Sequence, residues 1–189
     1  MTMDERQWLR DYLQRYQECI LRQDIPEQLI CLEYVLIAAR TRARKVIMAG
    51  NGGSAAIASH CAVDFTKSAG IRCINFNEAD LITCFANDYG YEHWLEKALE
   101  FYADDGDVVI LISSRGKSPN MLKAAEYACG RELTLVTFTG FMADNPLKGL
   151  GQLNFWVDSC AYNLVEMTHQ IWLLAVCDLI IGKAEYASH

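Results

Sequence analysis

The chain has 189 residues, a length that fits one domain built around a single sizeable hydrophobic core. Hydrophobic residues make up 52% of it and charged residues 22%, a composition typical of an ordered globular protein. The formal net charge of −7 leaves no excess of cations to attract polyanions, which argues against a general nucleic-acid surface or an anionic-membrane surface. The only candidate basic patch, residues 41–45, is interpreted as a charged helix end that leads into a strand.

The cysteines indicate a reducing compartment. They are scattered through apolar runs with no CxxC or CxxH spacing, which predicts buried free thiols rather than disulfides or a zinc cluster. The eight positions are Cys19, Cys31, Cys61, Cys73, Cys84, Cys129, Cys160 and Cys177. The N-terminal segment is charged rather than leader-like, and no apolar run reads as long enough to span a bilayer. We therefore expect a soluble, cytoplasmic protein with no membrane partner.

Two helices open the chain. Residues 4–23 and 27–43 have helical spacing, and Pro26 stands near the start of the second helix, a position that proline tolerates. From residue 45 onward, apolar strands alternate with amphipathic helices. The predicted order is strand 45–50, helix 54–69, strand 71–76, helix 90–103, strand 107–113, helix 118–130, strand 133–139, strand 153–158 and helix 161–182. This alternation predicts an α/β fold, a doubly wound parallel sheet covered by helices on both faces.

In such folds, ligands bind outside the carboxyl ends of the strands, beside the first turns of the helices that follow. The loop after the first strand, residues 50–55, reads GNGGSA. Its glycines allow a close approach of the backbone, and the next helix offers free N–H groups to an anion. Two alternatives stay open: a purely structural tight turn, and a loose GxGxxA dinucleotide site in which Glu78 would be the supporting acid.

The loop after the third predicted strand, residues 113–118, reads SSRGKS. Three hydroxyls and two cations, Arg115 and Lys117, stand at the start of a helix, where phosphate oxygens find donors. The alternative is an ordinary serine N-cap with solvated cations. The Walker pattern GxxxxGK[ST] is absent, so we predict a small phosphorylated ligand rather than a nucleoside triphosphate.

The order of these motifs resembles the sugar isomerase (SIS) domain family, specifically its phosphoheptose isomerase branch. The matching stretches are residues 50–60, 85–92, 106–124, 135–140 and 163–180. The resemblance implies a five-stranded parallel sheet flanked by helices and a homotetramer. Residues 1–44 would form a helical oligomerisation segment, and residues 45–189 the sugar-phosphate-binding part of one domain. The ligand would lie between protomers.

The resemblance also implies a set of binding residues. The family's phosphate loop corresponds to Ser113, Ser114 and Ser118, with Arg115 in place of a serine that the family usually has. The glycine loop would contribute Asn51, Gly52, Gly53 and Ser54. Asp88, in the ANDYG motif, would lie close to the sugar.

Phosphoheptose isomerases move a carbonyl between C1 and C2, which requires a base and an acid beside the substrate. Where the resemblance places the catalytic glutamate, this chain has Asp64, one helical turn after His60. Where it places a glutamine and a histidine on the last helix, this chain has Val165 and Leu173. In some members these four groups hold zinc. With His60 and Asp64 alone the metal would be poorly coordinated, so we expect the metal site to be lost and no cofactor to be needed.

His169 is a candidate substitute for the missing histidine. Val165, His169 and Leu173 are spaced by four residues and share one stripe of the last helix. We therefore hypothesise that His169 and Asp64 form a displaced acid–base pair, with Glu166 orienting the imidazole. The alternative is that His169 is merely a core or interface histidine.

The sequence thus favours a sugar phosphate isomerase that converts sedoheptulose 7-phosphate to mannoheptose 7-phosphate or acts on a related sugar. The alternative is a non-catalytic SIS module that binds a phosphosugar or a protein partner such as a replication initiator. The branch of initiator-associating proteins also lacks a histidine at the position of Leu173 and has arginine at the position of Arg115. No direct contact with nucleic acid is expected.

Overall fold

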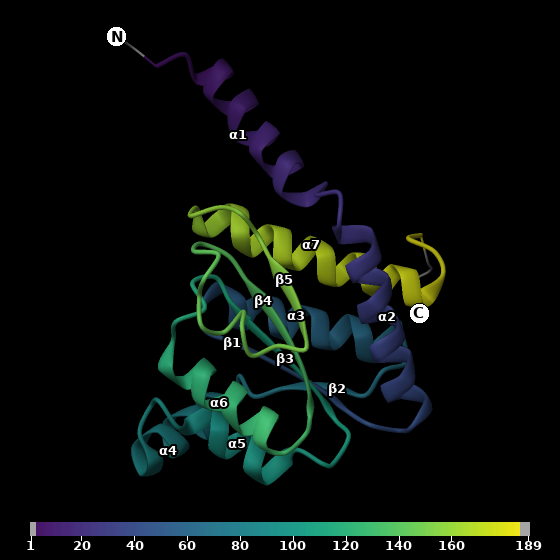
Figure 1. The fold of residues 1–189 in the computed structure, drawn as a ribbon, viewed down its shortest axis with the longest axis vertical. Helices are drawn as coiled ribbons and strands as arrows, with labels where there is room; N and C mark the ends of the chain where they lie inside the picture. Colours follow the sequence, from purple (N-terminus) through teal and green to yellow (C-terminus); the bar gives the residue numbers. More distant parts are fainter. Residues whose placement is uncertain (1–2, 186–189) are drawn as a thin grey trace.

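The computed structural model describes residues 3–185 and contains one five-stranded parallel sheet with helices on both faces (Figure 1). The strand order is β2-β1-β3-β4-β5, and every neighbouring pair runs parallel. The strands are β1 (Val46–Gly50), β2 (Cys73–Asn75), β3 (Val108–Ser113), β4 (Thr134–Thr139) and β5 (Leu153–Trp156). The predicted doubly wound sheet is confirmed. From β1 the chain first adds β2 on one side and then crosses to β3 on the other, so the switch point of the topology lies between β1 and β3.

The sheet is covered by two groups of helices (Figure 1). One face carries α2 (Ile25–Thr41), α3 (Gly53–Lys67) and α7 (Tyr162–Ile181), and the other carries α4 (Ala79–Tyr89), α5 (Trp94–Tyr102) and α6 (Pro119–Gly130). Successive strand residues point to opposite faces, so Met48 enters the first core and Ile47 the second. Burial on both sides explains why the strands read as continuous apolar runs.

The helices that open the chain differ in their surroundings. Leu32 and Leu36 of α2 belong to the same core as β1 and β3, so the segments 1–44 and 45 onward share one core. The first helix, α1 (Glu5–Ile20), begins after Asp4, whose carboxylate caps it, and none of its residues is buried. It points away from the body of the protein (Figure 1). Its end is held where the Trp172 indole N–H donates to the Ile20 carbonyl at 3.2 Å.

The sequence analysis missed α4. The predicted helix 90–103 corresponds to α5 alone, and a separate helix stands before it, ending at Gly90 with φ +87°. Its apolar residues Leu81, Ile82, Phe85 and Ala86 pack against the core beneath α5 and α6. Their spacing of three and four was the available signal. The ANDYG motif occupies the end of this helix and had been interpreted only as a ligand-contacting segment.

All eight cysteines are free, as predicted, but only three of them are buried. Cys31, Cys84, Cys129 and Cys160 are exposed, so the prediction of burial is wrong for these four. The first three lie on α2, α4 and α6, each of which covers the sheet with one side and leaves the other open. Burial raises the pKa of the Cys61 and Cys177 thiols to about 12, which keeps them protonated and inert.

The expectation that no apolar run is long enough to span a bilayer also needs correction. Among residues 3–185, α7 is long and apolar enough to cross a membrane by length and composition, with a mean hydropathy of 1.6 over its best window. In this structure 44% of that window is buried in the core against the sheet, α2 and α3, whereas Met167, Ile171 and Leu179 are exposed. A helix that packs against a sheet and two other helices needs apolar residues on much of its circumference, which explains the buried part of this pattern.

Candidate functional site

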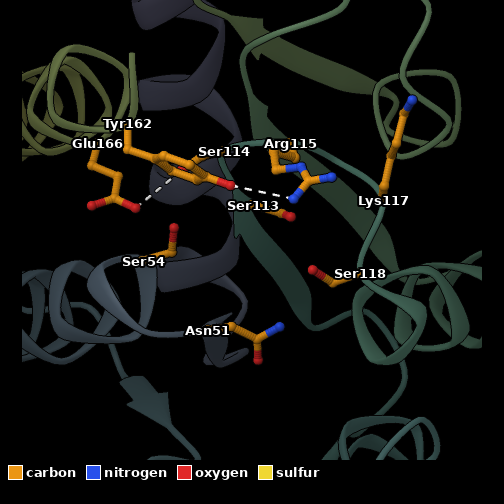
Figure 2. Close-up of a pocket in the computed structure, with 9 residues that line it drawn as sticks. All are labelled: Asn51, Ser54, Ser113, Ser114, Arg115, Lys117, Ser118, Tyr162 and Glu166. Carbon is orange, nitrogen blue, oxygen red and sulfur yellow. Dashed lines mark hydrogen bonds between the residues drawn. The ribbon is translucent and has the colours of Figure 1, made fainter. Parts of the chain in front are cut away.

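A cavity of about 290 Å³ opens at the carboxyl ends of β1 and β3, the switch point of the sheet. Figure 2 shows side chains from α3, from α7 and from the loops after β1 and β3 around it, with the Lys117 ammonium turned away from the others. The lining residues are Asn51, Ser54, Ser113, Ser114, Arg115, Lys117, Ser118, Tyr162 and Glu166. Six of the predicted binding residues are therefore brought together, from segments up to 67 residues apart in the sequence.

The glycine loop forms one wall. Gly50 ends β1 so close to the next turn that a Cβ there would lie 2.6 Å from the Ser54 carbonyl carbon. Gly52 precedes α3 with φ +56° and ψ −123°, a conformation that side chains disfavour. No side chain caps α3. The N–H groups of Ser54 and Ala55 donate to the carbonyls of Asn51 and Gly52 at 3.1 and 3.0 Å, so this helix start attracts an anion chiefly through the positive end of its dipole. The glycines thus form a tight turn that also brings the start of α3 to the cavity, so the structural interpretation of this loop and the anion-binding interpretation are compatible.

The serine loop forms the opposite wall. Ser113 ends β3, and the chain turns at Gly116 with φ +62° before α6 begins. Ser118 occupies the N-cap position of α6, but its hydroxyl makes no capping hydrogen bond. The alternative interpretation, in which the Ser118 side chain serves as an ordinary N-cap, is therefore wrong. The hydroxyl faces the cavity instead (Figure 2).

The start of α7 forms the third wall. No side chain caps this helix either, and Tyr162 and Glu166 project from its first two turns into the cavity (Figure 2). The N-terminus of a helix carries the equivalent of about half a positive charge. Three such ends, together with four serine hydroxyls and two cationic side chains, make the cavity suited to an anion.

Glu166 gives the cavity a carboxylate as well. The Ser114 hydroxyl donates to Glu166 Oε1 at 3.2 Å, and a Cβ on Gly53 would lie 2.3 Å from Oε2. Gly53 therefore leaves room for this carboxylate over the first turn of α3. At the rim, Arg115 Nη1 donates to the Tyr162 hydroxyl at 3.5 Å (Figure 2). The sequence analysis missed Tyr162, although it stands four residues before Glu166 and thus on the same face of the helix.

Some predicted residues lie outside this cavity. Asp88 is exposed on α4, where it accepts hydrogen bonds from Asn87 at 2.9 Å and from the Cys84 thiol at 3.8 Å. Glu78, the acid that a dinucleotide site would need, precedes α4 and does not line the cavity.

His60 and Asp64 form a separate group with Gln170 of α7, here called the His60 cluster. His60 Nε2 lies 3.1 Å from Asp64 Oδ2, and the Gln170 amide donates to His60 Nδ1 at 2.9 Å. Asp64 lies ten residues beyond Ser54 on α3, which corresponds to about 15 Å of helix. Within this chain, the His60 cluster and the cavity are therefore separate places along the α3–α7 contact.

His169 makes no hydrogen bond to Asp64 in this chain, so the predicted Asp64–His169 pair is not formed there. The imidazole is fully buried, its Nε2–H donates to the Thr139 carbonyl at 2.9 Å, and its Nδ1 has no partner among the described residues. Burial lowers the pKa of His169 to about 4. His169 is therefore a core histidine, which was the alternative interpretation of this residue. Glu166 also differs from its predicted role, because it contacts Ser114 rather than the His169 ring.

The zinc site that the resemblance implies for some members does not fit these residues. Val165 and Leu173 are fully buried apolar side chains and offer no donor atom. Both nitrogens of His60 already have protein partners at hydrogen-bonding distance. Within residues 3–185, no group of three metal-ligating side chains comes together. The donor set therefore falls short of what tetrahedral zinc requires.

Comparisons with known proteins agree with this architecture. The SIS domain family matches residues 21–140. A phosphoheptose isomerase of Fusobacterium nucleatum is 35% identical over 138 residues, covering 70% of this chain and 71% of that protein. The DnaA initiator-associating protein DiaA of Yersinia pestis is 29% identical over 164 residues, covering 82% and 84%. The solved structure of a phosphoheptose isomerase from Francisella tularensis superposes with a TM-score of 0.87 at 21% identity, covering 96% of this chain and all of that one, and so supports the fold.

Proposed function

Because this chain belongs to the SIS domain family, we propose that it is a sugar phosphate isomerase whose substrate phosphate lies in the cavity at the ends of β1 and β3. One observation carries the proposal: three helices without side-chain caps begin at a single cavity that four serines line. Helix N-termini and hydroxyls are the donors that phosphate oxygens accept, and Arg115 and Lys117 add charge at the rim.

The sugar would extend from the phosphate toward Glu166, the carboxylate that lines the cavity. Aldose–ketose isomerisation needs a base that takes a proton from the hydroxyl-bearing carbon beside the carbonyl. A proton then returns to the former carbonyl carbon, while an O–H proton moves between the two oxygens, so no further reactant is consumed. Glu166 is positioned to accept protons or hydrogen bonds from the sugar hydroxyls. A sedoheptulose 7-phosphate is the first substrate to test, since phosphoheptose isomerases are among the relatives.

Asp64 remains the second proposed carboxylate, and it would act across a subunit boundary. About 15 Å of helix separates it from Ser54, too far to reach the sugar that is bound in the cavity of its own protomer. A homotetramer with shared sites would allow the His60 cluster of one copy to serve a neighbour. Trp8, Leu9 and Leu13 of α1 are exposed in the protomer and offer an apolar surface for such an assembly.

A non-catalytic module that binds a phosphosugar or a protein partner is the second candidate. It is favoured by Val165 and Leu173, which replace two polar groups of the family pattern with buried apolar side chains. The similarity to an initiator-associating protein points the same way. In this second candidate, the cavity still binds the phosphosugar, but no proton transfer takes place.

An exchange experiment distinguishes the two candidates. The purified protein is incubated with sedoheptulose 7-phosphate in deuterated water, and deuterium at C1 and C2 is followed by NMR. We expect incorporation together with the appearance of the aldose. Tight binding of the sugar phosphate with no exchange would reject catalysis and support the binding module. Absence of binding to any sugar phosphate in a small panel would reject both.

Serine variants test the location of the phosphate. Removing the hydroxyl of Ser118 deletes a hydrogen bond to a charged oxygen, which should weaken binding of the sugar phosphate about tenfold or more. Ser68 is the matched control, because it stands at the far end of α3. Its alanine variant should bind as the unaltered protein does. Equal affinities for Ser118→Ala and Ser68→Ala would place the phosphate elsewhere.

A further inference from the structure

Behind the cavity lies a polar side chain that the proposed function does not use. Asn120, in the first turn of α6, is 1% exposed. Its Nδ2 donates to Asn51 Oδ1 at 2.9 Å, and Asn51 Nδ2 donates to Asn120 Oδ1 at 3.0 Å. The Tyr91 hydroxyl donates to the same Asn51 oxygen at 3.3 Å. Two partly buried hydrogen bonds thus join the start of α6 to the loop after β1.

These bonds determine what Asn51 can offer to a ligand. An amide oxygen has two lone pairs and an amide nitrogen has two hydrogens. Asn120 and Tyr91 occupy both lone pairs of the Asn51 oxygen, and Asn120 accepts one hydrogen. One N–H of Asn51 is left over. In Figure 2 the Asn51 nitrogen is turned toward Ser118 and the oxygen is turned away from it.

We infer that Asn120 is a positioning residue that holds the Asn51 amide with its free N–H toward the ligand phosphate. A flip of the Asn51 amide alone would break both hydrogen bonds to Asn120 and would present an oxygen to a phosphate oxygen, and two acceptors repel each other. The reciprocal pair therefore makes the Asn51 amide a donor toward the ligand, which favours anions. This inference rests on the proposed function, because it assumes that the cavity holds a phosphate.

The variant Asn120→Asp tests it through a pH profile. At pH 8 the carboxylate has no proton to donate to Asn51 and brings a negative charge close to the ligand, so affinity for inorganic phosphate should fall about tenfold or more. Burial and the nearby anion raise the pKa of a carboxyl at this position. When that carboxyl takes up its proton, its O–H again donates to Asn51 and its carbonyl again accepts. Affinity relative to the unaltered protein should then recover as the pH falls toward 5.

The comparison must be made as a ratio at each pH. Phosphate itself changes its charge near neutrality, and both proteins share the other ionisable groups around the amide pair. These groups are Arg115, Lys117, Tyr162 and Glu166 in the cavity and Tyr91 beside Asn51. Dissociation constants for inorganic phosphate and for sedoheptulose 7-phosphate are measured by calorimetry between pH 5 and 8. The ratio cancels the titrations that the two proteins have in common.

Tyr91→Phe is the second variant. Tyr91 is exposed, so its loss should leave the fold intact while it frees one lone pair of Asn51, and phosphate binding should weaken about twofold to fivefold. A structural role for Asn120 would lower the melting temperature but leave the affinity ratio near one at every pH, which would overturn the inference. Failure of the unaltered protein to bind phosphate or the sugar phosphate would instead overturn the proposed function.

Discussion

Two stripes of residues lie side by side on α7 and have different surroundings. The cavity stripe, defined as Tyr162 and Glu166, contacts Arg115 and Ser114 at the cavity. Gln170 continues the same line of the helix and contacts His60 outside the cavity. The core stripe, defined as Val165, His169 and Leu173, is fully buried against the sheet. Neighbouring residues are rotated by about 100° around a helix, so a shift of one position exchanges a ligand-facing side chain for a core side chain.

The two stripes also differ in what their polar atoms contact. Glu166 and Tyr162 keep capacity for a ligand, since each has a single hydrogen-bonding side chain as partner at the cavity. His169 lies between the rings of Phe138 and Trp172, with one nitrogen on a backbone carbonyl and the other without a partner among the described residues. The proposed function therefore depends on the cavity stripe, whereas the core stripe contributes to the stability of the fold.

The largest expected effect concerns His169 and acid. Burial lowers the pKa of His169 from 6.5 to about 4. Between pH 6.5 and pH 4, His169 is therefore protonated in the unfolded chain and neutral in the folded protein. The free energy of unfolding should therefore fall as the pH drops through this range, by up to about 3 kcal/mol from this group. Urea unfolding at several pH values measures it.

His169→Gln is the control for this titration, because glutamine offers an N–H to the Thr139 carbonyl but does not titrate. The variant should lack this portion of the acid destabilisation, although other groups continue to titrate in both proteins. Its affinity for phosphate at pH 8 should match that of the unaltered protein. Identical pH slopes in the two proteins would contradict the assignment of His169 to the core stripe.

Two glycines allow the stripes to be disturbed one at a time. A Cβ on Gly140 would lie 2.6 and 2.8 Å from the two methyl carbons of Val165, so Gly140→Ala should lower the free energy of unfolding by about 2 kcal/mol through overpacking. A Cβ on Gly53 meets only the end of the flexible Glu166 side chain. Gly53→Ala should therefore cost less than about 1 kcal/mol while it displaces the carboxylate.

Gly130→Ala is the matched control for both glycine variants, since no atom lies within 4 Å of a Cβ built at this helical position. It should lose no stability, because alanine is the better helix former. Chemical denaturation of the three variants measures their free energies of unfolding and so ranks the three losses of stability. Equal losses for Gly140→Ala and Gly53→Ala would mean that the two stripes are packed alike.

The smallest expected effect concerns the charge of the cavity stripe. Glu166→Gln keeps an acceptor for the Ser114 hydroxyl but removes a negative charge that faces the phosphate. Inorganic phosphate should bind a few-fold more tightly, with the free energy of unfolding changed by less than about 0.5 kcal/mol. Isomerase turnover should fall. Unchanged phosphate affinity would show that Glu166 does not share the cavity with the ligand.

Much of this was predictable from local patterns. The strands, most helices and both phosphate-loop candidates follow from apolar runs, glycines and serines at strand ends, and parallel strands bring such ends to one edge of the sheet. The missed α4 carries its signal in Leu81, Ile82, Phe85 and Ala86, whose spacing is helical. The error about His169 arose because periodicity shows which residues share a face but not what that face meets.

The sequence by itself determined the chemistry at the strand ends, the alternation that builds the sheet, and the absence of donor atoms at Val165 and Leu173. Only the tertiary structure decided that the core stripe faces the sheet, that Tyr162 joins the cavity, and that Asn120 holds Asn51. The physical reason is that a helix can be rotated about its axis without a change in its own hydrogen bonds. Its orientation is fixed by the surfaces against which it packs, and these come from distant parts of the chain.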